Sequence, residues 1–278
     1  MKHLQNLHTH SVYCDGKDTL EEMIQTCIAK GFTSLGFSGH SYMYFADHIS
    51  MSLEGTEKYK EEVLMLKEKY KDSLSIFLGL EFEMFSEIDL SGYDYLIGST
   101  HYMNINGEKV GFDRSADEVR RVINTYYGGD GMKYARDFYA NLARLPEYGD
   151  FDIIAHFDLI TKHSENENFF DRNSNEYREY AIAAAEALAG KIPYFEVNTG
   201  AMARGYRTTP YPDPFILKEL NRLGFKPIIS SDCHQRDFVD YGFGQAAQLL
   251  KDNGFTEHYI LTDKGFVPSS LEDYILRK

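Results

Sequence analysis

Two histidines, His8 and His10, flank a single threonine where the first apolar run of the chain ends, in the stretch LHTHSVYCDG. In an extended strand, residues i and i+2 project to the same side of the backbone, so both imidazoles would face one point. Imidazole nitrogens that converge in this way are typical of a metal site. A His-x-His motif is weak on its own, so its meaning depends on what else gathers beside it.

Further residues of metal-binding types stand near the ends of other apolar runs, in GFSGH, FLGLEF, LIGSTH, IIAHFD and IISSDCH. A single histidine of this kind is more often a hydrogen-bonded core residue than a ligand, but six of the ten histidines share this placement. We interpret the set as ligands for divalent zinc, iron or manganese, which mixed imidazole and carboxylate sites bind. The candidate ligands are His8, His10, Asp15, His40, Glu81, His101, His156, Asp232 and His234.

These ligands need a scaffold that brings distant segments together, and the sequence predicts one. Short apolar runs alternate with longer segments of helical periodicity, which indicates parallel strands joined by right-handed helical crossovers. The first helix should begin at a capping box of Thr19 and Glu22 and end at Gly31. The predicted strands are Leu4–His8, Ser34–Phe37, Ser75–Leu80, Tyr93–Gly98, Asp152–Ala155, Tyr194–Val197 and Pro227–Ser230. The further predicted helices are Thr56–Tyr70, Ser115–Tyr127, Met132–Leu145, Asn175–Ala189, Asp213–Leu223 and Gln245–Asp252.

Strand and helix units that follow one another without a linker rich in proline, glycine or serine favour one barrel over two separate halves. We therefore predict an α/β fold, a distorted TIM-like (β/α)7 barrel in a single domain over residues 1–278, with an open sheet as the alternative. In such folds a site gathers at the carboxyl ends of the strands, where the candidate ligands fall. The tail HYILTDKGFVPSSL is expected to add a strand or a hairpin.

Composition and charge exclude several classes of function. The net charge of −14, without a block of lysine or arginine, argues against nucleic-acid partners and anionic membranes. No run approaches the roughly 20 apolar residues of a membrane helix, and no secretion signal is evident. Three cysteines without paired spacing indicate a reduced, cytoplasmic protein, and Cys14 and Cys233 are expected to point away from the neighbouring ligands. The sequence does not indicate an oligomeric state.

With these motifs the chain resembles the polymerase and histidinol phosphatase (PHP) family, over roughly Leu4 to Gly244. The chain length and the aromatic segment HSYMYF, which begins at His40, are most similar to the histidinol-phosphate phosphatases of that family. The resemblance implies a distorted seven-stranded barrel with three divalent metal ions. Asp15 stands where many members have a histidine. The implied ligands are His8, His10, Glu81 and Asp232 for the first ion, Glu81 as a bridge with His101 and His156 for the second, and Asp15, His40 and His234 for the third.

The resemblance also implies a reaction, the hydrolysis of L-histidinol phosphate to L-histidinol and phosphate in histidine biosynthesis. We hypothesise that a metal-bridging hydroxide attacks phosphorus, with His101, Glu81 and Asp232 at the reacting centre. Either Arg204 or Arg207, on the loop NTGAMARGYRTTPYP, would hold the phosphate oxygens. The cationic leaving group could meet aromatic or acidic side chains, although the aromatic ones equally fit loop packing and the acidic ones equally fit partners that orient ligands. These side chains are Tyr42, Phe45, Glu83 and Asp158.

Two alternatives stay open from the sequence alone. A member of the same family could hydrolyse nucleotides or other phosphoesters, and the net charge of −14 speaks only against DNA. A protein of the same fold could also bind metal without catalysis, although the full set of ligand types and the loop arginines argue against this.

Overall fold

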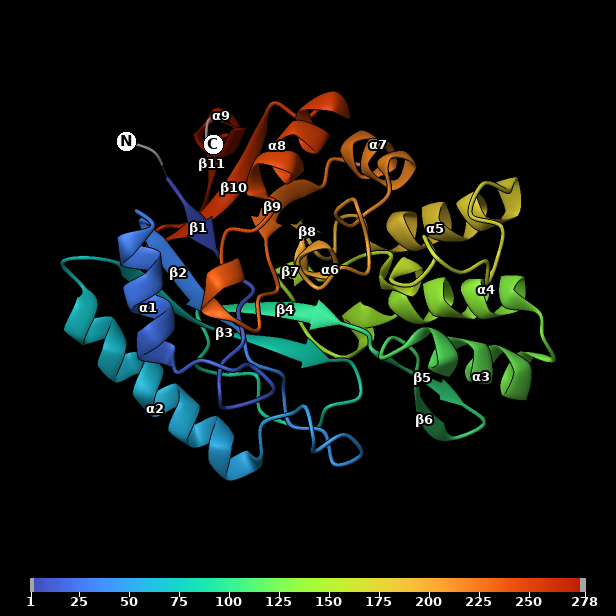
Figure 1. Ribbon diagram of the computed structural model, residues 1–278, viewed down its shortest axis with the longest axis horizontal. Helices are drawn as coiled ribbons and strands as arrows, with labels where there is room; N and C mark the ends of the chain where they lie inside the picture. Colours follow the sequence, from blue (N-terminus) through green and yellow to red (C-terminus); the bar gives the residue numbers. More distant parts are fainter. Residues whose placement is uncertain (1–2, 276–278) are drawn as a thin grey trace.

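Seven parallel strands curve into a nearly closed barrel in the computed structural model, which describes residues 3–275 (Figure 1). The strands follow one another around the sheet in chain order, and every hydrogen-bonded pair is parallel. The prediction of an α/β barrel of TIM type is confirmed. The strands are β1 (Gln5–Asn6), β2 (Ser34–Phe37), β3 (Ser75–Glu83), β4 (Tyr95–Ser99), β7 (Ile153–Ile154), β8 (Tyr194–Asn198) and β9 (Lys226–Ser230).

Helices surround the sheet, with α1 and α2 on one side and α3 to α5 on the opposite side (Figure 1). The predicted capping box of Thr19 and Glu22 is confirmed at the start of α1, and Gly31 adopts a left-handed φ of 75° just beyond its end. The helices are α1 (Leu20–Ala29), α2 (Leu53–Tyr70), α3 (Ala116–Tyr127), α4 (Gly131–Leu142), α5 (Asn175–Leu188), α6 (Gly200–Ala203), α7 (Pro214–Arg222), α8 (Phe243–Asp252) and α9 (Glu272–Ile275). Short 3-10 helices span Leu145–Glu147, Leu159–Thr161 and Arg236–Phe238.

One tyrosine, Tyr95 of β4, fills the interior of the barrel. Its hydroxyl donates a hydrogen bond to the Leu7 carbonyl and lies 3.2 Å from the Phe37 carbonyl. A Cβ atom on Gly36 would lie 2.3 Å from the tyrosine hydroxyl, and one on Gly79 would lie 2.2 Å from its ring. Glycines at these two strand positions therefore make room for the ring, which belongs to a cluster of buried apolar residues inside the barrel.

The seam of the barrel lies between β1 and β9, and a buried side-chain amide spans it. An isolated parallel bridge between Thr9 and Cys233 brings the two segments together. Asn6 Nδ2 donates to Ser231 Oγ (2.7 Å) and to the Val239 carbonyl (2.9 Å). The Asn6 amide thus replaces part of the ladder that a fully closed barrel would form between these strands.

The tail forms the predicted hairpin, with β10 (Glu257–Thr262) antiparallel to β11 (Gly265–Ser270). Gln5 ties this hairpin to β1, because its side-chain amide accepts from the Leu261 N–H (2.7 Å) and donates to the Leu261 carbonyl (2.8 Å). The Tyr274 hydroxyl of α9 also accepts from the Gln5 N–H (3.0 Å). The carboxyl-terminal hairpin and α9 therefore pack against the first strand.

Strand ends differ from the prediction where polar side chains are buried. The first strand was expected over Leu4–His8, but β1 ends at Asn6. The His8 N–H donates to Asn6 Oδ1 (3.1 Å) and not to a neighbouring strand. The third strand was expected to end at Leu80. In the structure β3 continues to Glu83, and both Glu81 and Glu83 are buried within it. Polar residues that resemble a loop in the sequence therefore lie inside a strand at the site.

A hairpin of β5 (Tyr102–Ile105) and β6 (Glu108–Gly111) was not predicted. Its turn is Asn106–Gly107, in which both residues have a positive φ (54° and 90°). An Asn-Gly dipeptide between strand-forming residues is a strong hairpin signal, so the sequence did contain the information. Within residues 3–275, no helix combines the length and the apolar character needed to cross a bilayer.

Candidate metal centre

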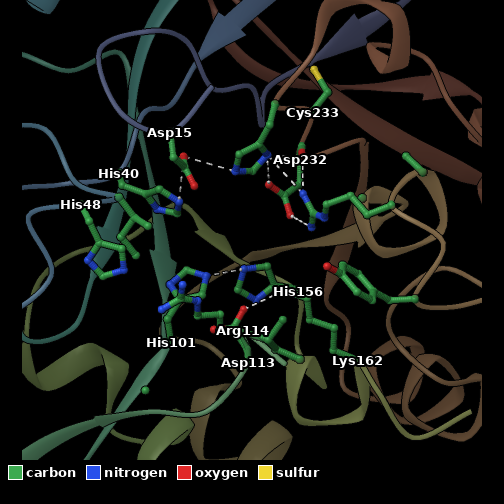
Figure 2. A pocket seen from close by; sticks show the side chains of 18 of the residues that line it. Asp15, His40, His48, His101, Asp113, Arg114, His156, Lys162, Asp232 and Cys233 are labelled. Atoms are coloured by element: carbon green, nitrogen blue, oxygen red, sulfur yellow. Dashed lines mark hydrogen bonds and ion pairs between the residues drawn. The ribbon is translucent and has the colours of Figure 1, made fainter. Parts of the chain in front are cut away.

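The nine candidate ligands come together at the carboxyl ends of the strands, beside a cavity of about 940 Å³. Figure 2 shows five of them around the cavity, namely Asp15, His40, His101, His156 and Asp232. Three of them, His8, His10 and Glu81, are buried at its floor. The other six line the cavity itself: Asp15, His40, His101, His156, Asp232 and His234. Segments separated by more than two hundred residues in the chain thus contribute to one cluster, as the barrel topology requires.

The carboxylate of Glu81 occupies the centre of the cluster. Its Oε2 atom lies 2.7 Å from His40 Nδ1 and 3.3 Å from His8 Nε2. Its Oε1 atom lies 3.2 Å from His156 Nε2 and 3.5 Å from His101 Nε2. One carboxylate therefore faces imidazoles from both halves of the barrel, a position suited to a bridging ligand.

Eight of the nine candidate ligands fall into three overlapping groups, each with ligand atoms close enough to hold an ion, and His156 belongs to none of them. The groups differ from the sets implied by the family resemblance, because His10 also joins the Asp15 group, His40 also joins the Glu81 group, and Glu81 is not grouped with His8. The division of ligands among individual ions stays a prediction. The groups are His10 with Asp15, His40 and His234; His8 with His10 and Asp232; and His40 with Glu81 and His101.

Several buried atoms at the centre of this cluster make no hydrogen bond of regular geometry within the described chain, although some lie close together, as His40 Nδ1 and Glu81 Oε2 do at 2.7 Å. They are His8 Nε2, His10 Nε2, Asp15 Oδ1, His40 Nδ1 and Glu81 Oε2. Unpaired buried polar atoms are rare and costly in folded proteins, so such a concentration calls for a ligand. Imidazole nitrogens and carboxylate oxygens that converge in this way fit divalent metal ions such as zinc.

Crowding of charges shifts the pKa values of neighbouring imidazoles in opposite directions. Burial alone would lower the pKa of His40, but the carboxylates of Glu81 and Asp15 outweigh burial and raise this pKa to about 10. Burial, together with the nearby His234 and His40, lowers the pKa of His10 to about 3. The pKa of Glu81 is held well below its ordinary value, because the surrounding imidazoles outweigh the cost of burial. Protons on residues such as His40 therefore compete with metal ions for the same carboxylates.

Two glutamates, Glu196 and Glu83, contact candidate histidine ligands and orient them. Glu196 of β8 is fully buried, accepts from His8 Nδ1 (2.8 Å) and accepts from the His156 backbone N–H (2.7 Å). Glu83 Oε2 accepts from the His101 backbone N–H (2.7 Å) and lies 3.2 Å from His101 Nδ1. Contacts of this kind fix the ring and the tautomer of a metal-binding histidine. Sequence reasoning missed Glu196, although an acidic residue inside the apolar predicted strand Tyr194–Val197 is itself a signal, because glutamate is rarely fully buried unless it has a partner.

The two loop arginines occupy different environments. Arg204 lines the cavity, and its guanidinium lies 3.0 Å from Asp232 Oδ2 and 3.1 Å from His234 Nδ1. Asp232 itself has a left-handed φ of 46°, which is uncommon outside glycine and occurs at functional positions. The Arg207 side chain is buried away from the cavity, where it pairs with Asp213 (2.8 Å). Of the two candidates, only Arg204 is placed to reach a ligand in the cavity.

Of the other side chains predicted to contact substrate, one lines the cavity and three do not. Phe45 lines the cavity and packs edge-to-face on Tyr102, with ring centroids 4.9 Å apart. Tyr42 and Glu83 do not line the cavity. Asp158 is fully buried beside Arg207, and its Oδ2 accepts from the Asp213 N–H (3.0 Å). The structure therefore places Asp158 and Arg207 together in a buried polar network behind the site.

The cysteines that adjoin candidate ligands are not equivalent. Cys14 was expected to point away from the ligands, but its Sγ lies 3.4 Å from His10 Nδ1. That expectation is wrong because the segment after His10 is a turn, closed by the Cys14 N–H to the Ser11 carbonyl (3.0 Å), and not an extended strand. Cys233 is buried, and Figure 2 shows its side chain directed away from the ligand cluster, as expected.

Several charged residues of the cavity wall had no place in the sequence-based site. Lys17, Arg114 and Lys162 line the cavity, and Lys162 pairs with Asp113 at 2.9 Å. Figure 2 shows Asp113, Arg114 and Lys162 beside His101 and His156, on the side of the cavity away from Asp15. These residues lie on loops and on the entry to α3, where no spacing rule in the sequence distinguishes them from ordinary surface charges.

Comparison with known proteins gives a consistent result. The model of the PHP domain family matches residues 6–200. A Deinococcus radiodurans protein named "Probable histidinol-phosphatase" is 27% identical over 265 residues, which cover 91% of this chain and 95% of that protein. A Bacillus subtilis protein named "Histidinol-phosphatase" is 24% identical over 259 residues, which cover 85% of this chain and 95% of that protein.

A solved structure supports the same fold. The crystal structure of a histidinol phosphate phosphatase from Lactococcus lactis, complexed with zinc, L-histidinol and phosphate, matches with a TM-score of 0.71 and 21% identity. The match covers 95% of this chain and 98% of that chain. Nearly the full length of both chains therefore shares one architecture.

Proposed function

The chain belongs to the PHP domain family, and from this premise we propose that it is a metal-dependent phosphatase that hydrolyses L-histidinol phosphate to L-histidinol and phosphate. The names of the relatives support this substrate, and so does the Lactococcus lactis structure with its bound zinc, L-histidinol and phosphate. A role in histidine biosynthesis follows from the reaction. The observation that carries the proposal is a cavity with unpaired imidazole and carboxylate atoms at its floor and cationic side chains in its walls.

The proposed centre holds three divalent ions, with zinc as the first choice and iron or manganese as alternatives. The nine candidate ligands would hold them, with Glu81 shared between ions. Bound ions would lower the pKa of a coordinated water toward about 7 and offset the negative charge of phosphate. Glu196 and Glu83 support this arrangement, because their contacts hold His8 and His101 in fixed orientations.

Side chains of the cavity wall account for the binding of a phosphate group by an acidic chain of net charge −14. The Arg204 guanidinium borders the ligand cluster and can donate paired hydrogen bonds to phosphate oxygens. Lys162 adds a second cation on the side of His101 and His156. Local cations of this kind orient the ester and stabilise charge that develops on its oxygens during phosphoryl transfer.

The leaving group would lie beside Phe45 and Tyr102, which line the cavity and present aromatic surface. Aromatic rings are suited to contact an imidazole through stacked or edge-to-face packing. We place the enzyme in the cytoplasm as a single domain of residues 1–278, acting on a small molecule without nucleic-acid or membrane partners.

A panel of phosphate esters tests the proposal. Release of inorganic phosphate by the purified protein would be measured with L-histidinol phosphate, nucleoside monophosphates and sugar phosphates, each with and without a chelator. We expect the highest kcat/KM for L-histidinol phosphate and loss of activity with the chelator. Equal activity on a nucleotide would favour the broader phosphoesterase alternative, and no release from any ester would favour a metal-binding protein without catalysis.

A further inference from the structure

One acidic side chain stands in the cavity wall where an anionic substrate would have to bind. Asp113 pairs with Lys162 at 2.9 Å, and the two side chains are 22% and 13% exposed. Both line the cavity on the side of His101 and His156 (Figure 2). A carboxylate in this place repels phosphate, so its presence needs a reason beyond the binding of the anion.

The carboxylate of Asp113 stays ionised. Burial raises its pKa, but the Lys162 ammonium and the nearby His101 imidazole outweigh burial and hold this pKa well below its ordinary value. Lys162 is the only described side chain that donates a hydrogen bond to this carboxylate, and it does so at Oδ2. The other oxygen, Oδ1, is therefore available to a cation that enters the cavity.

We infer that Asp113 binds the ammonium group of the substrate and so selects phosphate esters of amino alcohols in which the amine is on the carbon next to the ester-bearing carbon. The inference rests on the proposed function, because L-histidinol phosphate is such an ester. When the substrate enters, Lys162 turns from Asp113 to the phosphate group, and the substrate amine takes its place at Asp113. No bond is made or broken in this exchange, and each charge keeps a partner of opposite sign.

The spacing of charges favours the exchange. In an ester of this class the ammonium and the phosphate oxygens are close enough to contact one another, as Lys162 and Asp113 are at 2.9 Å. The substrate therefore presents one positive and one negative group at a matching distance. Its ammonium can pair with Asp113 while its phosphate pairs with Lys162. A phosphate ester without the amine would leave Asp113 unpaired once Lys162 turned away, and an unpaired charge in a partly buried wall is costly.

The loop that contains Asp113 is held in place by packing against His163, which itself packs on Tyr206. His163 Nε2 lies at hydrogen-bond distance (3.0 Å) from the Asp113 carbonyl, and the His163 ring packs edge-to-face on Tyr206. Lys162 Nζ also lies 5.3 Å from the centre of the Tyr206 ring. The carboxylate and the ammonium are therefore presented by segments that are already packed together, which lowers the entropic cost of binding.

Other acidic residues near the cavity are engaged elsewhere. Glu118 accepts from the Arg114 N–H (3.1 Å) and lies 3.7 Å from Arg121. Asp15 belongs to the imidazole cluster. Glu83 and Asp158, which the sequence suggested for the cationic leaving group, do not line the cavity. Asp113 is thus the acidic side chain best placed to meet an amine.

The test compares two esters on the metal-loaded enzyme, L-histidinol phosphate and imidazolylpropyl phosphate, the analogue that lacks the amine. The wild type should prefer L-histidinol phosphate by about 10- to 100-fold in kcat/KM. Asp113→Asn should lower kcat/KM for L-histidinol phosphate by the same factor and change the analogue by less than about threefold. Binding of L-histidinol in the presence of phosphate, measured by calorimetry, should weaken in parallel. The matched control Glu118→Gln should alter neither ester.

Several results would overturn the inference. An equal loss for both esters in the Asp113→Asn variant would mean that Asp113 only positions Lys162. A wild type without preference for the amine would also exclude amine recognition, and this comparison holds even if the variant fails to fold. Phosphate release from neither ester by the wild type would instead refute the proposed function, and this inference with it.

Discussion

The first strand and the turn that follows it contain two kinds of buried polar residue, and they differ in hydrogen bonding. Gln5 and Asn6, at the seam of the barrel, bond to Leu261, Ser231 and the Val239 carbonyl. The Nε2 atoms of His8 and His10, a few residues later, make no hydrogen bond of regular geometry in the described chain and lie 3.3 Å from Glu81 Oε2 and 3.2 Å from Asp232 Oδ1, respectively. A buried unpaired group costs about 1–3 kcal/mol, so the concentration of such atoms around His8 and His10 indicates a place where a ligand can bind.

The comparison also separates neutral polar groups from charged ones. The seam uses side-chain amides, which bond to backbone groups and to serine hydroxyls without net charge. The metal centre places the carboxylates of Glu81 and Asp232 among imidazoles, and neighbouring charges shift the pKa values of both kinds of group. Substitutions at the seam should therefore change stability, whereas substitutions at the centre should change metal binding and activity.

The largest effect is expected for Glu81→Ala, which removes the carboxylate shared by imidazoles from both halves of the barrel. We expect kcat/KM to fall by about 10³-fold or more and bound metal to be lost, because one carboxylate is proposed to serve more than one ion. Phosphate release and elemental analysis measure the two effects. The control is Glu87→Ala, at an exposed position nearby. A Glu81→Ala protein with full metal content and activity would contradict the assignment.

The next effect is expected for Glu196→Gln. Glutamine keeps the shape of the side chain but removes the charge that His8 and the His156 N–H contact at 2.8 Å and 2.7 Å. We expect metal affinity to fall by about 10- to 100-fold, as for other residues that orient metal-binding histidines. Competition with a chelator gives the affinity, and Glu186→Gln on the exposed side of α5 is the matched control. An unchanged affinity would mean that Glu196 supports only the fold.

A substitution at the seam should lower the stability of the fold and leave metal affinity unchanged. Gln5→Met keeps the volume of the side chain but leaves the N–H and the carbonyl of Leu261 without their partner. We expect the free energy of unfolding to fall by about 1–3 kcal/mol, while metal affinity stays within about twofold of the wild type. Chemical denaturation measures the first quantity, with Gln25→Met on the exposed side of α1 as control. A loss of metal affinity equal to that of Glu196→Gln would show that the two regions are not separate.

The smallest effect is expected at His258 of β10, and it depends on pH. Burial lowers the pKa of this histidine to about 4. Because the folded pKa lies below the unfolded value of about 6.5, the stability contribution is complete above pH 6.5 and is lost as pH falls toward 4. His258→Leu should therefore remove an acid-induced loss on the order of 1–2 kcal/mol. Urea unfolding at pH 5 and pH 8 tests this, and the same pH slope in both proteins would contradict it.

The ligand cluster could be read from the sequence because it depends on a regular rule. Parallel strands bring their carboxyl ends to one rim, so residues such as His8, Glu81 and Asp232 converge if the strands are located correctly. Small errors at the strand ends, such as the early end of β1 at Asn6, did not disturb this convergence. The fold and the ligand cluster therefore follow from strand order and from residue type.

The cavity wall could not be read in this way. The loop turn after α6 (Gly200–Ala203) brings Arg204 to the cavity and buries Arg207 against Asp213, and the two arginines are only three positions apart. The pair of Asp113 and Lys162 joins two loops that meet only after the barrel has formed. No local periodicity relates such residues, so the arrangement of the cavity wall was the part of the site that required the structure.

The most direct test of the account is anomalous diffraction from crystals grown with zinc. The unpaired atoms His8 Nε2, His10 Nε2 and Glu81 Oε2 should then each lie about 2.0–2.3 Å from an anomalous peak, and the same rim should hold three peaks in all. Crystals in which this rim has no peak, while the same side chains keep the positions described here, would contradict the claim that these buried unpaired atoms form a metal centre.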